Sequence, residues 1–303
     1  MLKNEKILIT GPASQVALPI ARELAKHNEV YGLARFGDAQ DRTRLEGFGV
    51  QCIRADLATD SFASVPDDCS YVLDFAVVKT GDFDYDLAAN AEGLGRLMYH
   101  TRKAKAWLHC STTGVYAYAG QKALKETDPL GENGHRYILP TYTIAKIAAE
   151  AVARFAARQW NIPTTIARLN VPYGDNGGLP AYHLDAMASG APVVAHPDTP
   201  NLFNPLHEDD YGAHIPKLLA VARVPATTLN WGGSVAVSVE EWCAYMGELT
   251  GLEVKYHHTD KAIGSVHIDL SRMHELIGPT TVDWHDGIRR MIHARHPELT
   301  LRK

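Results

Sequence analysis

Short apolar runs alternate with longer amphipathic stretches along the first half of the chain. Apolar and β-branched runs bounded by turn residues are typical of buried strands, and apolar residues three and four positions apart indicate a helix. The alternation predicts an α/β fold with a doubly wound, parallel, Rossmann-type sheet. The predicted strands are residues 6–10, 29–34, 50–54, 71–76, 106–111 and 163–169, and the predicted helices between them are residues 17–27, 39–48, 86–103 and 142–160.

The pattern loosens after Gly174, where Gly, Pro and Asn become frequent around one predicted helix at 181–189. We expect a dinucleotide-binding domain in residues 1–174 and a smaller C-terminal α/β lobe, mainly substrate-binding, in residues 175–303. Residues 205–231 are predicted to return to the sheet as a helix and a strand. Three further helices are predicted at 238–250, 268–277 and 283–295, and Ser238 and Glu241 form a capping-box pattern at the start of the first.

The composition narrows the possible functions. The 303 residues are 46% hydrophobic and 21% charged, and the net charge of −5 offers no basic surface for nucleic acid. No apolar run approaches the roughly 20 residues that cross a bilayer, and the first residues do not resemble a signal peptide. The four cysteines are far apart, which is typical of reduced thiols in a cytoplasmic protein. No HExxH-like spacing predicts a metal site.

Tyr142 and Lys146 are four residues apart at the start of the predicted helix 142–160, so their side chains share one face. A nearby ammonium favours the phenolate, and we expect Lys146 to lower the pKa of Tyr142 from its ordinary value of about 10. Tyr142 would then exchange a proton at neutral pH as a general acid or base. The pair alone also fits a half-buried tyrosine beside a solvated lysine, and the other features of the chain favour the catalytic interpretation.

The turn after the first predicted strand contains Gly11, Ser14, Gln15 and Val16 and leads into a helix. Backbone N–H groups and the helix dipole at such a turn can bind a pyrophosphate. Ser14 stands where a glycine is usual, so its Cβ crowds the phosphate, although its hydroxyl could donate to a phosphate oxygen. A plain turn without a ligand is the alternative.

Other cofactor candidates also follow strand ends, where doubly wound sheets bind ligands. Arg35 follows the second strand, and an arginine there suits the 2′-phosphate of NADP, whereas an acid would suit the ribose of NAD. Asp56 and Leu57 fit an adenine, and Ala76 and Val77 would flank the diphosphate and ribose. A solvated Arg35 and a turn-capping Asp56 are the alternatives.

The segment 111–116 ends the strand 106–111, and its hydroxyls would face a nicotinamide from the same side as Tyr142. A hydroxyl there can hold a substrate oxygen and fix the geometry of hydride transfer. Capping of a loop by Ser or Thr is the alternative. Asn170 follows the strand 163–169 and would border the nicotinamide.

Taken in order, these pieces resemble the extended short-chain dehydrogenases/reductases of the NAD-dependent epimerase/dehydratase group over essentially the whole chain. The resemblance implies that Tyr142 is the general acid/base, that Lys146 holds the nicotinamide ribose and that Thr112 is the catalytic Ser/Thr. It also implies a homodimer in which the helices of Asn90 and Tyr142 pair across a two-fold axis. Its carriers are Thr10-Gly11, Ser111-Thr112 with Val115-Tyr116, Tyr142-x-x-x-Lys146, Arg168-x-Asn170-x-x-Tyr173-Gly174 and Asn204-Pro-Leu-His-Glu-Asp-Asp210.

Differences from the group narrow the reaction. Sugar-nucleotide dehydratases resemble Thr-Asp-Glu-Val-Tyr-Gly after the fifth strand, and Thr113 and Gly114 replace that acidic pair here, which disfavours 4,6-dehydration. Phe203 stands where members that bind a nucleotide diphosphate carry an arginine, and Thr259-Asp-Lys-Ala262 replaces an Arg-x-Gly-Asp-like segment. These differences indicate a less polar pocket. Its expected substrate-binding residues are Thr113, Tyr173, His183 and Phe203.

We therefore expect an NAD(P)-dependent carbonyl reductase or alcohol dehydrogenase that acts on a small or moderately apolar substrate and uses NADP in preference to NAD. Three alternatives stay open. The first is a sugar-nucleotide epimerase with a retained cofactor, and the second is a regulatory protein that binds NADP without turnover. The third is a ligand-binding scaffold without a cofactor, which Ser14 in the phosphate turn suggests.

Overall fold

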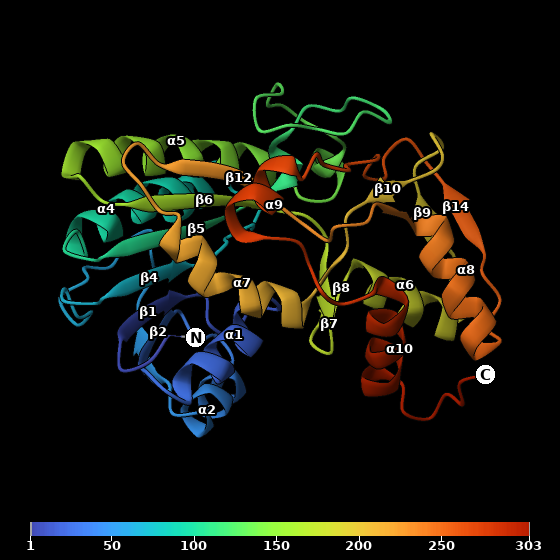
Figure 1. The fold of residues 1–303 in the computed structure, drawn as a ribbon, viewed down its shortest axis with the longest axis horizontal. Coiled ribbons are helices and arrows are strands. Elements are labelled where there is room, and N and C mark those ends of the chain that lie inside the picture. Colours follow the sequence, from blue (N-terminus) through green and yellow to red (C-terminus); the bar gives the residue numbers. More distant parts are fainter. Residues whose placement is uncertain (1, 303) are drawn as a thin grey trace.

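The computed structural model describes residues 2–302 and has a seven-stranded sheet at its centre (Figure 1). All neighbouring strands are parallel, in the order β12-β6-β5-β4-β1-β2-β3. The chain order reverses between β1 and β4, and ligands bind at such a reversal in doubly wound sheets. The predicted fold class is confirmed. The strands are β1 (Lys6–Thr10), β2 (Glu29–Ala34), β3 (Gln51–Arg54), β4 (Tyr71–Asp74), β5 (Ala106–Thr112), β6 (Thr164–Leu169) and β12 (Thr227–Trp231).

Helices cover both faces of the sheet. On one face α4 packs against α5, and on the other α1 packs against α2 and α7 (Figure 1). Buried apolar residues fill both layers, which explains why apolar residues predominate in the central strands. The helices of this part are α1 (Ala17–Ala25), α2 (Ala39–Gly47), α3 (Phe83–Leu87), α4 (Gly93–His100), α5 (Tyr142–Trp160) and α7 (Glu208–Ala220).

The single helix predicted for residues 86–103 is divided in the structure. A π-helical turn, η1 (Ala88–Glu92), separates α3 from α4. The turn carries Asn90, whose amide accepts from the backbone N–H of Val78 at 2.8 Å and donates to the carbonyl of Val78 at 2.6 Å. Single π-helical turns inside α-helices are frequent at functional sites. The apolar periodicity predicted a helix correctly, but a side-chain bond to a distant loop is not visible in periodicity.

The second part of the chain forms a smaller lobe at one end of the sheet (Figure 1). The helix α7 packs against the sheet, and the strand β12 (Thr227–Trp231) joins it by pairing with β6. The capping box of Ser238 and Glu241 is confirmed. The helices of the lobe are α6 (Leu179–Ala188), α8 (Val239–Thr250) and α10 (Trp284–Arg295), whereas α9 (Ser271–Ile277) packs against β12 and α7. The short strands of this part are β7 (Pro172–Gly174), β8 (Gly177–Gly178), β9 (Val193–Ala195), β10 (Leu202–Phe203), β11 (Leu206–His207), β13 (Val237–Ser238) and β14 (Tyr256–His258).

A long connection between β5 and α5 lies across the top of the view in Figure 1. It contains two short 3-10 turns, η2 (Thr113–Val115) and η3 (His135–Tyr137). The connection is fixed to the lobe, because Leu124 pairs with Ile268 and its carbonyl accepts a hydrogen bond from the Asn230 side chain at 2.8 Å. This anchoring determines which residues of the connection lie over the end of β5.

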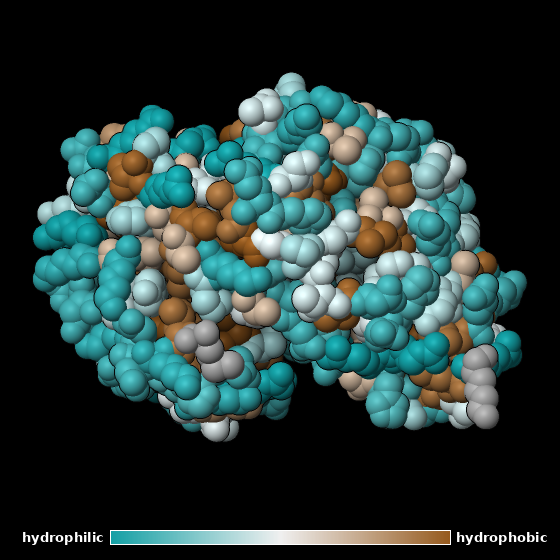
Figure 2. Space-filling view, viewed as in Figure 1, coloured by the Kyte–Doolittle hydropathy of each residue, from teal (hydrophilic) through white to brown (hydrophobic). Residues whose placement is uncertain are grey.

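Hydrophilic residues cover most of the face shown in Figure 2, and apolar residues gather where α1 and α7 lie. A groove of about 460 Å³ runs between these helices, lined in part by Pro19, Ile20, Ala213 and Pro216. Among residues 2–302, no helix combines the length and the apolar character that crossing a membrane requires.

Candidate active site

A cavity of about 310 Å³ lies at the carboxyl ends of β1, β2 and β4, next to the reversal of strand order. Predicted cofactor residues from four separate turns meet there, so the sheet assembles them as the sequence predicted. Phe36, Asp41 and Val78 also line the cavity and were not singled out from the sequence. The predicted residues in its lining are Gly11, Ser14, Arg35, Asp56, Leu57, Ala76 and Val77.

The first turn requires its glycine. Gly11 has φ +58°, and a Cβ at this position would lie 2.9 Å from the Cα of Ala76. Side chains are therefore excluded where the ends of β1 and β4 approach each other. The Oγ of Ser14 accepts from the backbone N–H of Ala17 at 3.3 Å, so Ser14 caps the start of α1 and its own O–H is free to donate outward. A phosphate oxygen could accept from this hydroxyl, and contact of Ser14 with a cofactor stays a prediction.

Gln15 and Val16 use their side chains for packing and anchoring. The Nε2 of Gln15 donates to the carbonyl of Pro172 at 2.9 Å, which ties the first turn to β7. Val16 precedes α1 and packs against the apolar core. Contact of these two residues with a cofactor, through their backbone N–H groups, stays a prediction.

A tyrosine that the sequence reasoning missed connects two predicted residues at the outer end of the cavity. Arg35 donates to the hydroxyl of Tyr85 at 2.8 Å, and this hydroxyl donates to Asp56 at 2.5 Å. The hydrogen bond to Asp56 raises the pKa of Tyr85 and keeps it a donor. Asp56 also accepts from the backbone N–H of Ala58 at 2.8 Å, so it caps a turn as well as lining the cavity.

A buried polar network lies under the cavity floor. The Thr10 hydroxyl donates to Asp74 at 2.6 Å and accepts from the backbone N–H of Ala76 at 2.9 Å. The other oxygen of Asp74 bonds His109 at 2.7 Å. Burial raises the pKa of Asp74, but the bond to His109 and the charge of Lys146 outweigh it and leave this pKa below its usual range. The network fixes the backbone of Ala76 at the cavity.

The three predicted catalytic residues lie together at the end of β5. Tyr142 is the first residue of α5, and the Thr112 side chain lies close enough to its hydroxyl to lower its pKa. The Thr112 hydroxyl accepts from the backbone N–H of Gly114 at 3.0 Å. Lys146, one helical turn after Tyr142, is buried and donates to the carbonyl of Cys110 at 2.8 Å. The geometry places a phenol, a hydroxyl and an ammonium around one strand end.

The expected effect of Lys146 on Tyr142 was wrong for this structure. Burial raises the pKa of Tyr142 to about 12, and the nearby Thr112 side chain lowers it only in part. The Lys146 ammonium is directed to the carbonyl of Cys110, and it is not among the groups that shift this pKa. Helical spacing placed both side chains on one face correctly, but spacing does not reveal which acceptor the ammonium takes. Tyr142 is therefore protonated at neutral pH and suited to donate.

A buried ion pair supports this strand end from below. Glu150 of α5 accepts from Arg168 through both oxygens at 2.8 Å and from the Ser111 hydroxyl at 2.7 Å. Burial raises the pKa of Glu150, but these hydrogen bonds outweigh it and hold this pKa below its usual range. Since Ser111 directly precedes Thr112, the pair fixes the backbone that carries the catalytic hydroxyl.

A buried aspartate holds the start of α5. Asp86 accepts from the Thr141 hydroxyl at 2.6 Å and from the backbone N–H groups of Thr80 and Gly81, each at 3.1 Å. It therefore connects the loop after β4 to the residue before Tyr142. Sequence reasoning missed Asp86, because nothing in the run Asp82-Phe-Asp-Tyr-Asp86 distinguishes it from the two aspartates before it.

Several predicted contact residues lie in the interior. Thr113 accepts from the Asn170 amide at 3.0 Å, and this amide also donates to the carbonyl of Val266 at 2.7 Å. Asn170 is fully buried, and the Tyr173 ring, 1% exposed, packs against His207. Contact of Asn170 with a cofactor, and of Thr113 and Tyr173 with a substrate, stays a prediction, because these groups are used in holding the lobe to the sheet.

His183 and Phe203 lie in the core of the lobe, against Trp242. The Trp242 indole donates to Nδ1 of His183 at 3.0 Å, and the Phe203 and Trp242 rings are 6.0 Å apart. Burial lowers the pKa of His183 to about 4, so it is neutral at pH 7. Substrate contact stays a prediction for both residues, and their packing suits support of the lobe.

His135 is a second feature that the sequence did not reveal. It lies in η3, and its ring is 5.5 Å from the ring of Tyr142. It comes close to the catalytic residues only because the connection after β5 folds back over Gly114. Among the described residues, no group of three His, Cys, Asp or Glu side chains is arranged to hold a metal ion.

Comparisons with known proteins agree with this architecture. A family model described as NAD dependent epimerase/dehydratase family matches residues 7–218. No curated protein matches the chain.

Solved structures of sugar-nucleotide enzymes superpose on nearly the whole chain at low identity. UDP-glucuronic acid 4-epimerase from Bacillus cereus, with UDP-glucuronic acid and NAD, has TM-score 0.82 at 19% identity and covers 95% of this chain and 98% of its own. The dTDP-glucose 4,6-dehydratase DesIV from Streptomyces venezuelae, with NAD bound, has TM-score 0.81 at 19% identity and covers 95% of this chain and 96% of its own. UDP-glucose 4-epimerase from Thermotoga maritima has TM-score 0.79 at 19% identity and covers 95% of this chain and 97% of its own.

Proposed function

Since the chain belongs to the NAD dependent epimerase/dehydratase family, we propose that it is a nicotinamide-dependent oxidoreductase acting on a carbon that carries a hydroxyl or carbonyl oxygen. The observation that supports this most is the convergence of Tyr142, Thr112 and Lys146 at the end of β5. The cavity at the carboxyl ends of β1, β2 and β4 has a glycine turn that suits the phosphates of a dinucleotide, and Arg35 and Asp56 line it where the adenosine would lie.

The side chains divide the work as follows. A bound nicotinamide supplies or accepts the hydride. Tyr142, protonated at neutral pH, donates its proton to the carbonyl oxygen as negative charge develops there, and it takes the proton back in the reverse direction. Thr112 donates a hydrogen bond to the same oxygen and orients it. Lys146, whose ammonium donates to the carbonyl of Cys110, would hold the nicotinamide ribose beside the phenol.

A sugar nucleotide is the first candidate substrate, with oxidation and re-reduction on a retained cofactor. This choice rests on the relatives of known structure, which bind UDP-sugars or act on dTDP-glucose. A small carbonyl compound is the second candidate. It is favoured by Phe203, a buried apolar residue where an arginine would meet a diphosphate. The relatives favour the first candidate over the second.

Loss of the Tyr142 hydroxyl tests the shared chemistry. Tyr142→Phe is expected to lower turnover by about 10²–10⁴-fold, the usual contribution of a positioned general acid. Tyr137→Phe is the matched control, because Tyr137 lies five positions earlier and is 48% exposed. Calorimetric titration with NADH and NADPH accompanies the kinetics. Absence of binding by both cofactors refutes the proposal, and binding with unchanged turnover in Tyr142→Phe favours a regulatory NADP-binding protein.

Net oxidation of the nicotinamide cofactor distinguishes the two candidate reactions. An epimerase converts UDP-glucose to its epimer without net change in nicotinamide absorbance and without added cofactor, if the cofactor co-purifies. A reductase consumes NADPH or NADH in proportion to the carbonyl compound reduced. Incubation with each substrate class, followed by chromatography and absorbance, decides between them.

We propose NADP as the preferred cofactor on the strength of Arg35 alone. Its guanidinium lines the cavity and is oriented by Tyr85. Asp41 lines the same cavity and would repel a 2′-phosphate, and the solved relatives contain NAD. Arg35→Ser is expected to weaken NADPH binding about tenfold and NADH binding little. Equal loss for both, or tighter NADH binding in the wild type, contradicts the preference.

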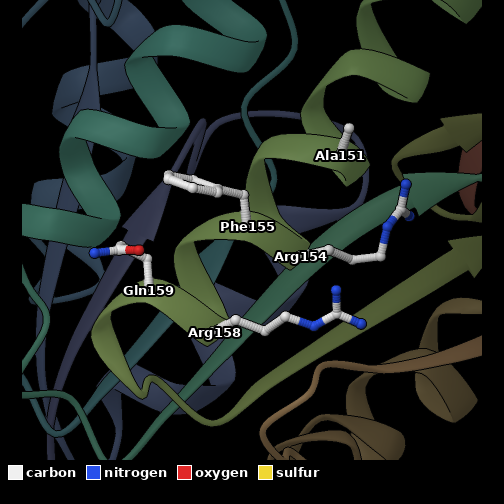
Figure 3. A pocket seen from close by; sticks show the side chains of 5 residues that line it. All are labelled: Ala151, Arg154, Phe155, Arg158 and Gln159. Atoms are coloured by element: carbon white, nitrogen blue, oxygen red, sulfur yellow. The ribbon is translucent and has the colours of Figure 1, made fainter.

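We also propose a homodimer through α4 and α5. Figure 3 shows Phe155 and Gln159 on one flank of α5, with Arg154 and Arg158 on the other. Phe155 is 60% exposed and Ile144 is 48% exposed on the same helix, which is unusual for large apolar residues unless a partner covers them. Light scattering is expected to show a dimer for the wild type and a monomer for Phe155→Arg. A monomeric wild type refutes this assembly.

A further inference from the structure

His135 is held in one place by its own loop. Gly134 has φ +103°, and a Cβ on it would lie 2.7 Å from the carbonyl oxygen of Ala262, so the loop contacts the lobe closely. The Glu132 carboxylate accepts from the backbone N–H groups of Gly134 at 2.9 Å and Arg136 at 2.8 Å. These contacts fix the backbone on both sides of His135.

The same turn continues into the catalytic helix. The carbonyl of His135 accepts a hydrogen bond from the backbone N–H of Leu139 at 2.6 Å. The carbonyl of Leu139 accepts one from the backbone N–H of Tyr142 at 3.1 Å. The position of the imidazole is therefore coupled to that of the catalytic phenol by two consecutive backbone hydrogen bonds.

The imidazole lies between Tyr142 and Gly114. Its ring centre is 5.5 Å from that of Tyr142, at an angle of 38°. A Cβ on Gly114 would lie 2.8 Å from Cε1 and 3.2 Å from Nε2 of His135, so only glycine leaves room for the ring. The backbone N–H of Gly114 is bonded to Thr112. The phenol, the hydroxyl and the imidazole thus surround one place.

One nitrogen of the imidazole is bound and the other is free. Nδ1 bonds the side-chain oxygen of Asn133, and in this orientation of the amide the hydrogen is on Nδ1 and a lone pair is on Nε2. Among residues 2–302, Nε2 has no hydrogen-bond partner, and it is not among the fully buried polar atoms. Burial lowers the pKa of His135 to about 4, so the ring is neutral at pH 7. A neutral imidazole held in this way accepts a hydrogen bond.

We infer that His135 binds the substrate, by accepting at Nε2 a hydrogen bond from a hydroxyl on the carbon next to the reacting one. The inference rests on the proposed function, because Tyr142 and Thr112 must hold the reacting oxygen for His135 to meet its neighbour. It assigns a substrate class: vicinal diols and the α-hydroxy ketones that they form on oxidation. Sugar rings belong to this class, whereas simple ketones and isolated alcohols do not.

The test compares substrate pairs that differ only in the neighbouring hydroxyl. Suitable pairs are UDP-glucose and its 3-deoxy analogue, acetoin and 2-butanone, and 1,2-cyclohexanediol and cyclohexanol. The wild type is expected to favour the hydroxylated member by roughly 10–100-fold in kcat/KM, because the analogue leaves the acceptor unpaired. His135→Phe keeps an aromatic ring without the acceptor, and it is expected to abolish this preference while changing kcat/KM for the analogue by no more than about twofold.

Contrary results separate the two proposals. If His135→Phe lowers kcat/KM equally for both members of a pair, or if the preference survives the substitution, the role of His135 is refuted while the proposed function stands. If the wild type turns over no member of any pair, the proposed function fails, and the role of His135 fails with it. Tyr142→Phe, measured on the same pairs, is expected to lose activity on both members alike.

Discussion

Gly114→Ala perturbs the site by a single methyl group. The added Cβ would lie 2.8 Å from Cε1 of His135, about 0.6 Å short of ordinary contact at 3.4 Å. Gly114 does not have a positive φ, so alanine fits the backbone, and removal of glycine's unfolded-state freedom would stabilise by at most about 1 kcal/mol. The neighbour must move instead, and the neighbour is the imidazole.

The expected loss follows from that displacement. A misplacement of about 1 Å at a site can cost roughly 100-fold in rate, so a shift of about 0.6 Å predicts a loss near tenfold in kcat/KM. The loss should affect hydroxylated substrates and spare their analogues, because only the former use His135. The melting temperature should change by no more than a few degrees, since no core contact is lost.

A double-mutant cycle makes this prediction specific. In the background of His135→Ala the collision partner is absent, so Gly114→Ala should have almost no further effect on kcat/KM. Gly47→Ala is the control, because a Cβ there meets no atom within 4 Å. The reasoning is refuted if Gly114→Ala costs as much in the His135→Ala background as in the wild type, since the methyl group would then act through something else.

Two other features make measurable predictions. Glu150→Gln removes the charge that Arg168 faces, and breaking a buried pair costs about 3–5 kcal/mol of unfolding free energy, or roughly 6–20 °C in melting temperature. The double variant Glu150→Leu with Arg168→Met should lose far less stability in calorimetry. An equal loss in both variants contradicts the assignment of Glu150 and Arg168 as a buried ion pair. Burial raises the pKa of Tyr142 to about 12. The difference in tyrosinate absorbance between the cofactor-free wild type and Tyr142→Phe should therefore stay flat from pH 7 to pH 10 and rise only above pH 10. A midpoint of this rise below pH 10 indicates that Lys146 acts on the phenol.

The parallel sheet was predictable because it depends on local signals. A strand buried on both faces is mostly apolar, and the predicted bounds of β1 and β2 agree with the structure. The cofactor cavity was predictable for the same reason, because residues that follow strand ends of a parallel sheet meet at one edge. Short strands such as β10 and β13 were not predicted, since two residues contain no periodicity.

The rest of the site depends on contacts between distant segments. His135 and Gly114 are adjacent only because the lobe holds the connection after β5, and no spacing in the sequence indicates this. Tyr85 meets Arg35 and Asp56 because the loop after β4 returns to the sheet edge. These contacts form only when the tertiary structure brings the segments together.

The replacement of the dehydratase-like acidic pair by Thr113 and Gly114 takes on a physical meaning in the structure. Thr113 is buried and its hydroxyl accepts a hydrogen bond from Asn170, so it supplies no carboxyl group to the site. Gly114 brings no side chain, and the imidazole of His135, from the far end of the same connection, fills the space beside it. A neutral acceptor thus stands where a carboxyl group would exchange protons. Elimination of water needs an acid at that place, but recognition of a hydroxyl needs only a fixed lone pair, so this site is suited to reversible oxidation of a diol in which no carbon–oxygen bond breaks.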